Sequence, residues 1–315
     1  MLDIRKLVLL REVEARGSIA AAAQALNYTR SAVSQQLSAL EAETGAALVD
    51  RGSRRAGLTV VGRALVEHTE RILDGLETAE SELLAATGRV HGELRVGVPY
   101  HEGPALLVPA LTRLRAAHPD LRITLHRAAA SESQQAVRLG RLDMVMAAQY
   151  DQVPEPRVPG LHEEPLANDR VRLAVAPEDV SPTAGGSGAV ERELGEFADR
   201  SWILDRDSGL GKLALHACAA AGFAPDVVAD TGDMQAALGL VSLGWGVALV
   251  PDLVPDRPGY PVRRIRLEGP ELIRRVSLVV RRGALTRPAV AAVLSALREG
   301  AGGLVQGTTA QPRPK

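Results

Sequence analysis

The sequence TRSAVSQQLSALE, at Thr29–Glu41, has the spacing of an amphipathic helix. Apolar residues recur at i, i+4 and i+7, while hydroxyls, amides and one guanidinium occupy the other side. Thr29 can cap this helix because its hydroxyl accepts a hydrogen bond from a first-turn amide. A polar face without a carboxylate before Glu41 favours close approach to phosphates and base edges. The apolar stripe is Val33, Leu37 and Leu40, and the polar face is Arg30, Ser31, Ser34, Gln35 and Ser38.

The residues before this polar helix predict a helix-turn-helix. An amphipathic helix begins at Ile4 and ends near Gly17, and a short alanine-rich helix follows at Ile19–Leu26. Asn27 starts the turn, since Asn tolerates a left-handed backbone. Two helices joined in this way place the second one in a major groove of DNA.

A basic hairpin, or wing, is predicted after the polar helix. Glycines separate arginines between two short extended runs, and those arginines can reach phosphates. On its own, the polar helix is also compatible with an ordinary solvated surface, because such motifs give false positives. The order of two helices, turn, polar helix and basic wing favours DNA binding. The predicted DNA contacts are Thr29, Arg30, Ser31, Ser34, Gln35, Ser38, Arg51, Arg54 and Arg55.

The succession GSIAAAAQALNYTRSAVSQQLSALEAETGAALVDRGSRRAGLTVVG, at residues 17–62, resembles the N-terminal domain of LysR-type transcriptional regulators almost without gaps. The family usually has Ser-Gln-Pro where this chain has Thr29-Arg30-Ser31, and Phe in place of Val49. The resemblance implies a bacterial, dimeric regulator that reads DNA and responds to a small molecule.

Length and composition fit a protein of about two domains. The chain has 315 residues, of which 46% are hydrophobic and 24% charged, with a net charge of −1. Local charge on the binding face matters more to a specific DNA binder than this balance. No apolar stretch approaches the roughly 20 residues needed to span a bilayer, and the N-terminus lacks a secretory signal. The predicted location is therefore the cytoplasm, at the nucleoid, and Cys218, the single cysteine, excludes an internal disulfide.

A long helix without proline is predicted from Val60 to about Thr87. Its apolar residues repeat with heptad spacing, which buries best against a second copy. A surface helix packed on its own domain remains an equal alternative on spacing alone. The resemblance favours the dimer seam and a homodimer or homotetramer. The predicted dimerisation residues are Leu65, Ile72, Leu76, Ala79 and Leu83.

Alternating strands and helices from Leu94 onward predict a parallel α/β sheet. A proline-rich connection at 154–165 leads to a strand at Val171–Ala176, and 177–195 is interpreted as a flexible insertion. The predicted fold is α/β with an all-α N-terminal part. It comprises a winged helix-turn-helix domain (1–59), a linker helix (60–88), an effector-binding domain (92–300) and a disordered tail (301–315). The effector domain resembles the two-lobed type 2 periplasmic-binding-protein fold, with lobe I at 92–162 and 268–300 and lobe II at 163–267.

An effector site is expected outside the carboxyl ends of the strands. Helix N-termini there favour a small anion or carboxylate. Glu102 would repel an anion, so a neutral, cationic or mixed ligand stays open, and Ser208 and Thr231 are equally interpretable as helix caps. The candidate effector contacts are Pro99, Tyr100, His101, Glu102, Ala148, Gln149, Ser208, Gly209 and Thr231.

Enzyme motifs are missing from this sequence. It has no G-x-S-x-G elbow, no Walker or G-x-G-x-x-G loop at a strand–helix junction, and no H-x-x-x-H pair. We expect no catalytic residue, metal or cofactor. The predicted partners are promoter DNA, a small-molecule effector, a second copy and, for an activator, RNA polymerase, but not a membrane. The alternative is a solute-binding or protein-binding coregulator whose helix-turn-helix does not read DNA.

Arg30 yields the first testable prediction. Arg favours the O6 and N7 acceptors of guanine, whereas Gln favours adenine. We expect an Arg30→Gln variant to lose a guanine preference at the base that residue 30 contacts. Selection sequencing of bound DNA measures this, and an identical site preference for both proteins would contradict it.

Overall fold

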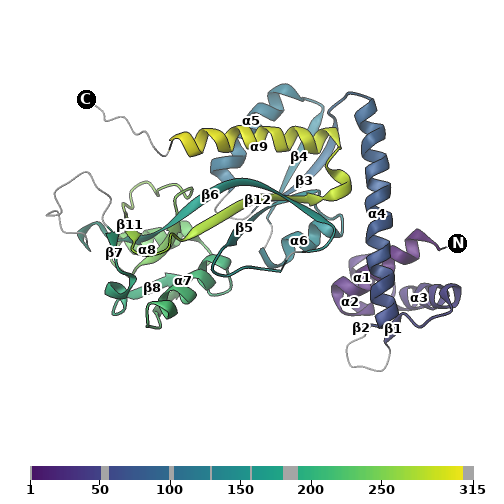
Figure 1. Cartoon of the computed structure of the whole chain (residues 1–315), viewed down its shortest axis with the longest axis horizontal. Helices are drawn as coiled ribbons and strands as arrows, with labels where there is room; N and C mark the ends of the chain where they lie inside the picture. The colour runs from purple at the N-terminus through teal and green to yellow at the C-terminus, as the bar shows by residue number, and fades with distance from the viewer. Residues whose placement is uncertain are drawn as a thin grey trace. The chain divides into compact units, whose positions relative to one another are not determined.

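A computed structural model describes residues 2–50, 57–98, 103–127, 130–156, 158–179 and 191–307 (Figure 1). The chain forms two compact units. Unit 1 is Met1–Arg89 together with Arg281–Arg287, and unit 2 is Val90–Val280 together with Pro288–Lys315. Among the helices in these ranges, none has both the length and the apolar content to cross a bilayer.

Unit 1 begins with three short helices, each capped by a side chain. They are α1 (Ile4–Arg16), α2 (Ile19–Ala25) and α3 (Arg30–Thr44), and their N-caps are Asp3, Ser18 and Thr29. The predicted stripe is confirmed, because Val33, Leu37 and Leu40 are all buried in one core with α1. The turn residue Asn27 has a φ of 57°, as its left-handed tolerance predicts.

The wing is present as a two-stranded hairpin. Strands β1 (Val49–Asp50) and β2 (Gly57–Leu58) pair antiparallel. Glu41 fixes the base of the hairpin, since its Oε1 accepts hydrogen bonds from the backbone N–H groups of Leu48 (2.9 Å) and Val49 (3.1 Å). The first carboxylate of α3 is therefore used inside the domain.

The long predicted helix is α4 (Val60–Ala86), which is capped by Thr59. Thr59 also donates to the backbone oxygen of Ala47 (2.8 Å), so it links the helix to the wing. Gly62 lies directly against the same segment. A Cβ added to Gly62 would come within 2.1 Å of the backbone oxygen of Leu48.

The first half of unit 2 is a parallel α/β arrangement, as predicted. Strand β3 pairs parallel with both β4 and β5, and β12 joins β5 antiparallel. Helices α5 and α9 contact each other, as Figure 1 shows. The elements are β3 (Gly92–Val98), α5 (Gly103–Ala117), β4 (Leu121–Arg127), α6 (Ala130–Arg138), β5 (Met144–Tyr150), β12 (Ile273–Arg281), a 3₁₀ turn η3 (Arg282–Ala284) and α9 (Pro288–Gly307).

The second half of unit 2 shares the main sheet, whose strand order is β4-β3-β5-β12-β6-β11-β7, with β10 also on β6. Strands β8 and β9 form a separate parallel pair. Strand β8 precedes helix α7, and strand β9 precedes helix α8. The elements are β6 (Leu161–Val175), η1 (Pro177–Asp179), β7 (Glu191–Arg192), η2 (Leu194–Phe197), β8 (Ser201–Leu204), α7 (Gly209–Ala220), β9 (Asp226–Asp230), α8 (Met234–Ser242), β10 (Ala248–Pro251) and β11 (Arg263–Leu267).

Strands β6 and β12 lie side by side and serve both halves of this sheet. Arg274 on β12 donates from Nη2 to Oδ2 of Asp169 on β6 (2.5 Å), and both side chains are almost fully buried. The other oxygen of Asp169 accepts from the backbone N–H of Leu253 (3.0 Å). This buried ion pair fixes the two strands to each other.

Three predictions about unit 2 were wrong. The connection predicted at 154–165 ends earlier, because residues 161–165 already belong to β6, where Pro165 occupies an exposed position that tolerates proline. Glu191–Arg192 is not part of a loop, since it pairs with β11 as β7. Residues 301–307 continue α9 instead of starting a disordered tail, because Ala301 is buried and each added residue gains a helical hydrogen bond. Residues 180–190 and 308–315 lie outside the described ranges.

Gly62 provides a test of the wing packing. We expect Gly62→Ala to lower the free energy of unfolding of unit 1 by about 1–3 kcal/mol, because the added methyl group meets a backbone oxygen. Gly75→Ala is the matched control on the same helix, as a Cβ there meets nothing within 4 Å. The control should be neutral or stabilising by up to about 1 kcal/mol. Thermal unfolding measures both, and equal effects would contradict the close packing.

Candidate nucleic-acid interface and ligand pocket

The predicted DNA-binding residues of α3 share one face. Thr29, Arg30, Ser31 and Gln35 are exposed, whereas Ser34 and Ser38 are half-buried beside them. Thr29 Oγ1 accepts from the N–H of Ala32 (3.2 Å) and shares a hydrogen bond with the Ser31 hydroxyl (3.0 Å). The predicted wing arginines, Arg51, Arg54 and Arg55, lie outside the described residues.

Two long side chains on this face are available to a partner. Within the described chain, Arg30 and Gln35 make no hydrogen bond or ion pair, and both side chains are exposed. The opposite stripe of α3 is buried and holds the helix in a fixed rotation about its axis. The face therefore presents a guanidinium and an amide that suit base edges and phosphates.

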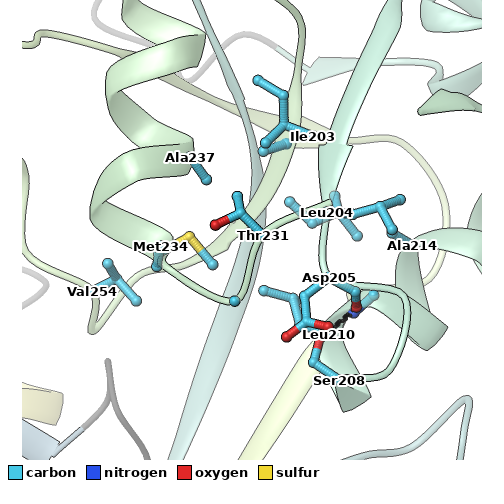
Figure 2. Close-up of a pocket in the computed structure, with 14 residues that line it drawn as sticks. Ile203, Leu204, Asp205, Ser208, Leu210, Ala214, Thr231, Met234, Ala237 and Val254 are labelled. Carbon is cyan, nitrogen blue, oxygen red and sulfur yellow. Dashed lines mark hydrogen bonds between the residues drawn. The ribbon is translucent and has the colours of Figure 1, made fainter. Parts of the chain in front are cut away.

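A pocket of about 100 Å³ lies in unit 2, between the first turns of α7 and α8 (Figure 2). Strands β8 and β10 contribute apolar side chains, and the turns before the two helices contribute the polar ones. Its lining is Ile203, Leu204, Asp205, Ser208, Leu210, Gly211, Ala214, Thr231, Gly232, Met234, Ala237, Ala248, Leu249 and Val254.

The polar groups around this pocket already serve the helix ends. Ser208 Oγ accepts from the N–H of Gly211 (2.9 Å) and donates to the backbone oxygen of Asp205 (2.8 Å). Thr231 Oγ1 accepts from the N–H of Asp233 (3.1 Å). Asp233 in turn caps α8 by accepting from Gln235 and Ala236. Ser208 therefore caps α7, as the alternative interpretation held, while Thr231 supports the cap of α8.

Only part of the predicted effector set meets at this pocket. Ser208 and Thr231 line it, but Ala148 and Gln149 on β5 do not, and Gln149 donates instead to Glu163 (3.5 Å). Gly209 lies against Tyr150, whose ring would be 2.9 Å from an added Cβ. The candidates Pro99, Tyr100, His101 and Glu102 lie outside the described residues.

Sequence reasoning missed the charged residue of the pocket. Asp205 directly follows β8, so the rule that ligands bind beyond the carboxyl ends of strands could have identified it. Met234, the first residue of α8, had no such signal, because a methionine at a helix start is equally typical of a core.

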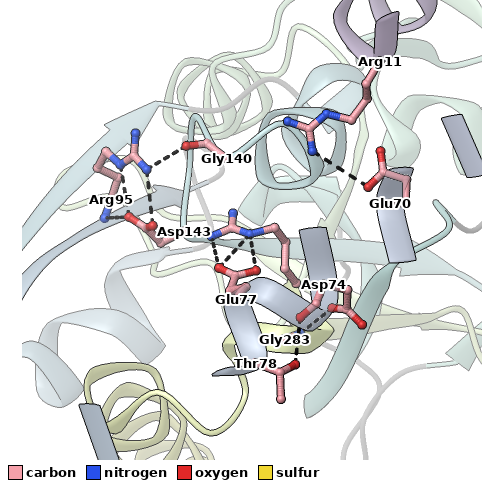
Figure 3. Close-up of polar contacts among 10 residues, drawn as sticks. Arg11, Glu70, Asp74, Glu77, Thr78, Arg95, Gly140, Asp143 and Gly283 are labelled. Carbon is pink, nitrogen blue, oxygen red and sulfur yellow. Dashed lines mark hydrogen bonds and ion pairs between the residues drawn. The ribbon is translucent and has the colours of Figure 1, made fainter. Parts of the chain in front are cut away.

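One face of α4 binds the segment that connects β12 to α9, at Arg281–Arg287 (Figure 3). Arg281 donates to the Glu77 carboxylate from Nε (2.8 Å) and Nη2 (2.6 Å), and the backbone N–H of Gly283 donates to Asp74 Oδ1 (2.6 Å). The Arg281 and Glu77 side chains are 18% and 21% exposed. An added Cβ on Gly283 would lie 2.5 Å from the backbone oxygen of Asp74, so the segment fits closely.

The opposite face of α4 carries most of the predicted seam. Ile72, Leu76 and Leu83 are 40%, 44% and 72% exposed, and Ala79 is exposed between them. Leu65 differs, since it packs against the core formed by α1–α3. The apolar stripe at 72, 76, 79 and 83 is thus open in a single chain.

Cys218 is buried in α7. Burial raises the pKa of its thiol to about 12, so the sulfur is protonated at neutral pH. Among the described residues, no cluster of three or more His, Cys, Asp or Glu side chains could hold a metal ion.

Two family models match the chain. Residues 4–63 match the bacterial regulatory helix-turn-helix protein, lysR family, and residues 87–302 match the LysR substrate binding domain. A relative from a Pseudomonas species, the SDS degradation transcriptional activation protein, is 38% identical over 125 residues, 40% of this chain. That alignment spans 41% of the relative's length, less than half of it.

Other similar proteins match over nearly the whole chain. The hydrogen peroxide-inducible genes activator of Haemophilus influenzae is 27% identical over 300 residues, which is 94% of this chain and 95% of that protein. The crystal structure of full-length CbnR complexed with its target DNA has a TM-score of 0.52 at 24% identity, covering 95% of this chain and 100% of that chain. This structure supports the fold alone. Since the two family models together span both units, the chain belongs to the LysR family of bacterial helix-turn-helix regulators.

Proposed function

We propose that this protein is a sequence-specific, DNA-binding transcriptional regulator controlled by a small molecule that binds in unit 2. The exposed face of α3, with Arg30 and Gln35 open to solvent, carries this proposal. The match of residues 4–63 to the lysR-family helix-turn-helix model supports it. We further propose a non-enzymatic role in the cytoplasm, since the similar proteins are regulators.

DNA reading follows from the way α3 is held. The buried stripe fixes the helix, Thr29 fixes its start, and Glu41 fixes the wing beside it. In the proposed complex the N-terminal half of α3 enters a major groove, where Arg30 and Gln35 meet base edges. The wing then follows the phosphate backbone.

Self-association through α4 is the second part of the proposal. The exposed stripe at Ile72, Leu76, Ala79 and Leu83 would be covered by the same stripe of a second copy. A pair of reading helices can then address half-sites about 34 Å apart on one face of DNA. Assembly of two such dimers would give a homotetramer.

The 281–287 segment is the proposed route by which the effector acts on α4. It continues from β12 and leads into α9, both elements of unit 2, and it holds Asp74 and Glu77 of α4. A displacement of β12 or α9 on ligand binding would therefore be passed directly to α4. The contact leaves the exposed stripe free, because the two lie on opposite faces of the helix.

Cys218 is poorly suited to a peroxide response of the kind named for the Haemophilus influenzae relative. A reactive cysteine needs an accessible thiolate. Cys218 is buried and its pKa is raised to about 12, so it is a poor nucleophile.

DNA binding is tested by mobility shift with the DNA upstream of the protein's own coding region. We expect binding that weakens steeply with salt, and an Arg30→Ala variant with affinity lower by about tenfold or more. Arg122→Ala is the control, since Arg122 is an exposed arginine on β4 of unit 2. An unshifted wild type at low salt would instead favour the protein-binding coregulator.

The contact between Arg281 and Glu77 is tested by Glu77→Gln. This change replaces a charge-assisted pair with neutral hydrogen bonding, so we expect a loss of about 1–2 kcal/mol in unfolding free energy. Glu80→Gln removes the same charge from an exposed position of α4 and should change little. Thermal unfolding of the full chain measures both. Equal stabilities for the two variants would show that the contact does not anchor α4.

A further inference from the structure

We propose that the pocket between α7 and α8 takes a small organic cation, a primary amine with a short apolar body. This rests on the proposed function, in which the pocket in unit 2 binds the effector. It names the ligand's chemical class from the charges, hydrogen bonds and apolar surface around the pocket.

The charge of the lining is the first observation. The fourteen lining residues include no Lys, Arg or His, and Asp205 is the one ionisable side chain among them. Among the described lining residues, a ligand that enters this pocket therefore meets a carboxylate and no compensating cation. Bringing an anion there would add repulsion at short range, whereas a cation gains an ion pair.

Half of the Asp205 carboxylate is available to such a ligand. Its Oδ1 accepts from the N–H of Asp207 (3.1 Å), whereas Oδ2 has no hydrogen-bond or ion-pair partner in the described chain. Gly232 keeps the space in front of Oδ2 open, because an added Cβ would lie 3.0 Å from that oxygen. A half-buried carboxylate oxygen facing a pocket is a ready acceptor for an ammonium group.

The chain's own side chains already occupy several amides at the two helix starts. The first-turn amides of Gln235 and Ala236 in α8 are already bound by Asp233, and the Gly211 amide of α7 is bound by Ser208. Arg206, which follows Asp205 in the sequence, pairs with Asp230. The positive end of α8 is thus occupied by the Asp233 carboxylate, and one first-turn amide of α7 is occupied by the Ser208 hydroxyl.

The remainder of the pocket fits an apolar body with a second polar contact. Figure 2 shows the Thr231 hydroxyl and the Asp205 carboxylate bordering the same opening, with Met234 and Val254 beside it. Thr231 Oγ1 uses one acceptor site for Asp233, so its second lone pair can accept from an ammonium, which carries three donors. A volume of about 100 Å³ suits a short apolar part.

Methyl NMR of the full chain labelled with ¹³C-methyl methionine tests this class. Met234 lines the pocket, whereas Met144 and Met146 are buried on β5 and report whether the fold changes. The probes share one isobutyl group and differ in the polar end: isobutylamine, isovalerate and isobutanol. We expect a saturable shift of Met234 with isobutylamine, and affinities lower by about tenfold or more for the other two.

Two variants locate the contact. Asp205→Asn keeps the shape of the side chain but removes its charge. We expect this variant to bind isobutylamine with an affinity lower by about tenfold or more. Asp207→Asn removes an equal charge from an exposed residue that does not line the pocket, and should retain the wild-type affinity. If Asp205→Asn shifts Met144 and Met146, Gly232→Ala replaces it, since its methyl group would crowd Oδ2 while the charge is retained.

The outcomes separate this proposal from the proposed function. Preferential binding of isovalerate at Met234 would overturn the cation class and leave the pocket as the effector site. If no probe shifts Met234 before Met144 and Met146 also respond, both the class and the pocket are overturned. DNA binding by α3 is tested independently, by the mobility-shift experiment.

Discussion

Helix α4 connects the other parts of this regulator. It contacts the DNA-binding domain, the 281–287 segment and solvent at different parts of its surface. Its first turns are fixed to the DNA-binding domain through Thr59 and the close approach of Gly62 to Leu48. Further along, Asp74 and Glu77 hold the 281–287 segment. The third side is apolar and open. Along its length, this one helix therefore contacts the DNA-binding domain, then the 281–287 segment, and leaves an apolar stripe open on the opposite face.

The two functional faces use charge in opposite ways. On α3 the polar surface is kept free of carboxylates, since the first one, Glu41, is turned to the backbone of the wing. Around the pocket, Asp233 caps α8, the Ser208 hydroxyl caps α7, and one oxygen of Asp205 faces the pocket. A polyanion suits the first surface and a small cation the second. Local arrangement, not the net charge of −1, determines what each surface can bind.

The helix-turn-helix was predictable in detail because its signals are local. Caps such as Thr29, the left-handed Asn27 and the buried stripe of α3 all depend on neighbours within one or two helical turns. The pocket was less predictable, since Ser208 and Thr231 are brought together only by the pairing of β8 with β9. Long-range pairing also explains why Pro165 proved to lie in a strand. Gly283 packs closely on α4 although the two are about two hundred positions apart in the sequence. No local sequence pattern predicts this contact.

The ion pair between Asp169 and Arg274 limits how the sequence can change over time. Because both side chains are almost fully buried, loss of either partner would leave a charge in a dry interior, at a cost of about 3–5 kcal/mol. A joint replacement by two apolar residues of similar volume would avoid the unpaired charge, and its cost would be mainly the loss of the acceptor for the Leu253 N–H. Descendants of this chain should therefore keep both residues or exchange both, so that positions 169 and 274 evolve as a unit across strands β6 and β12.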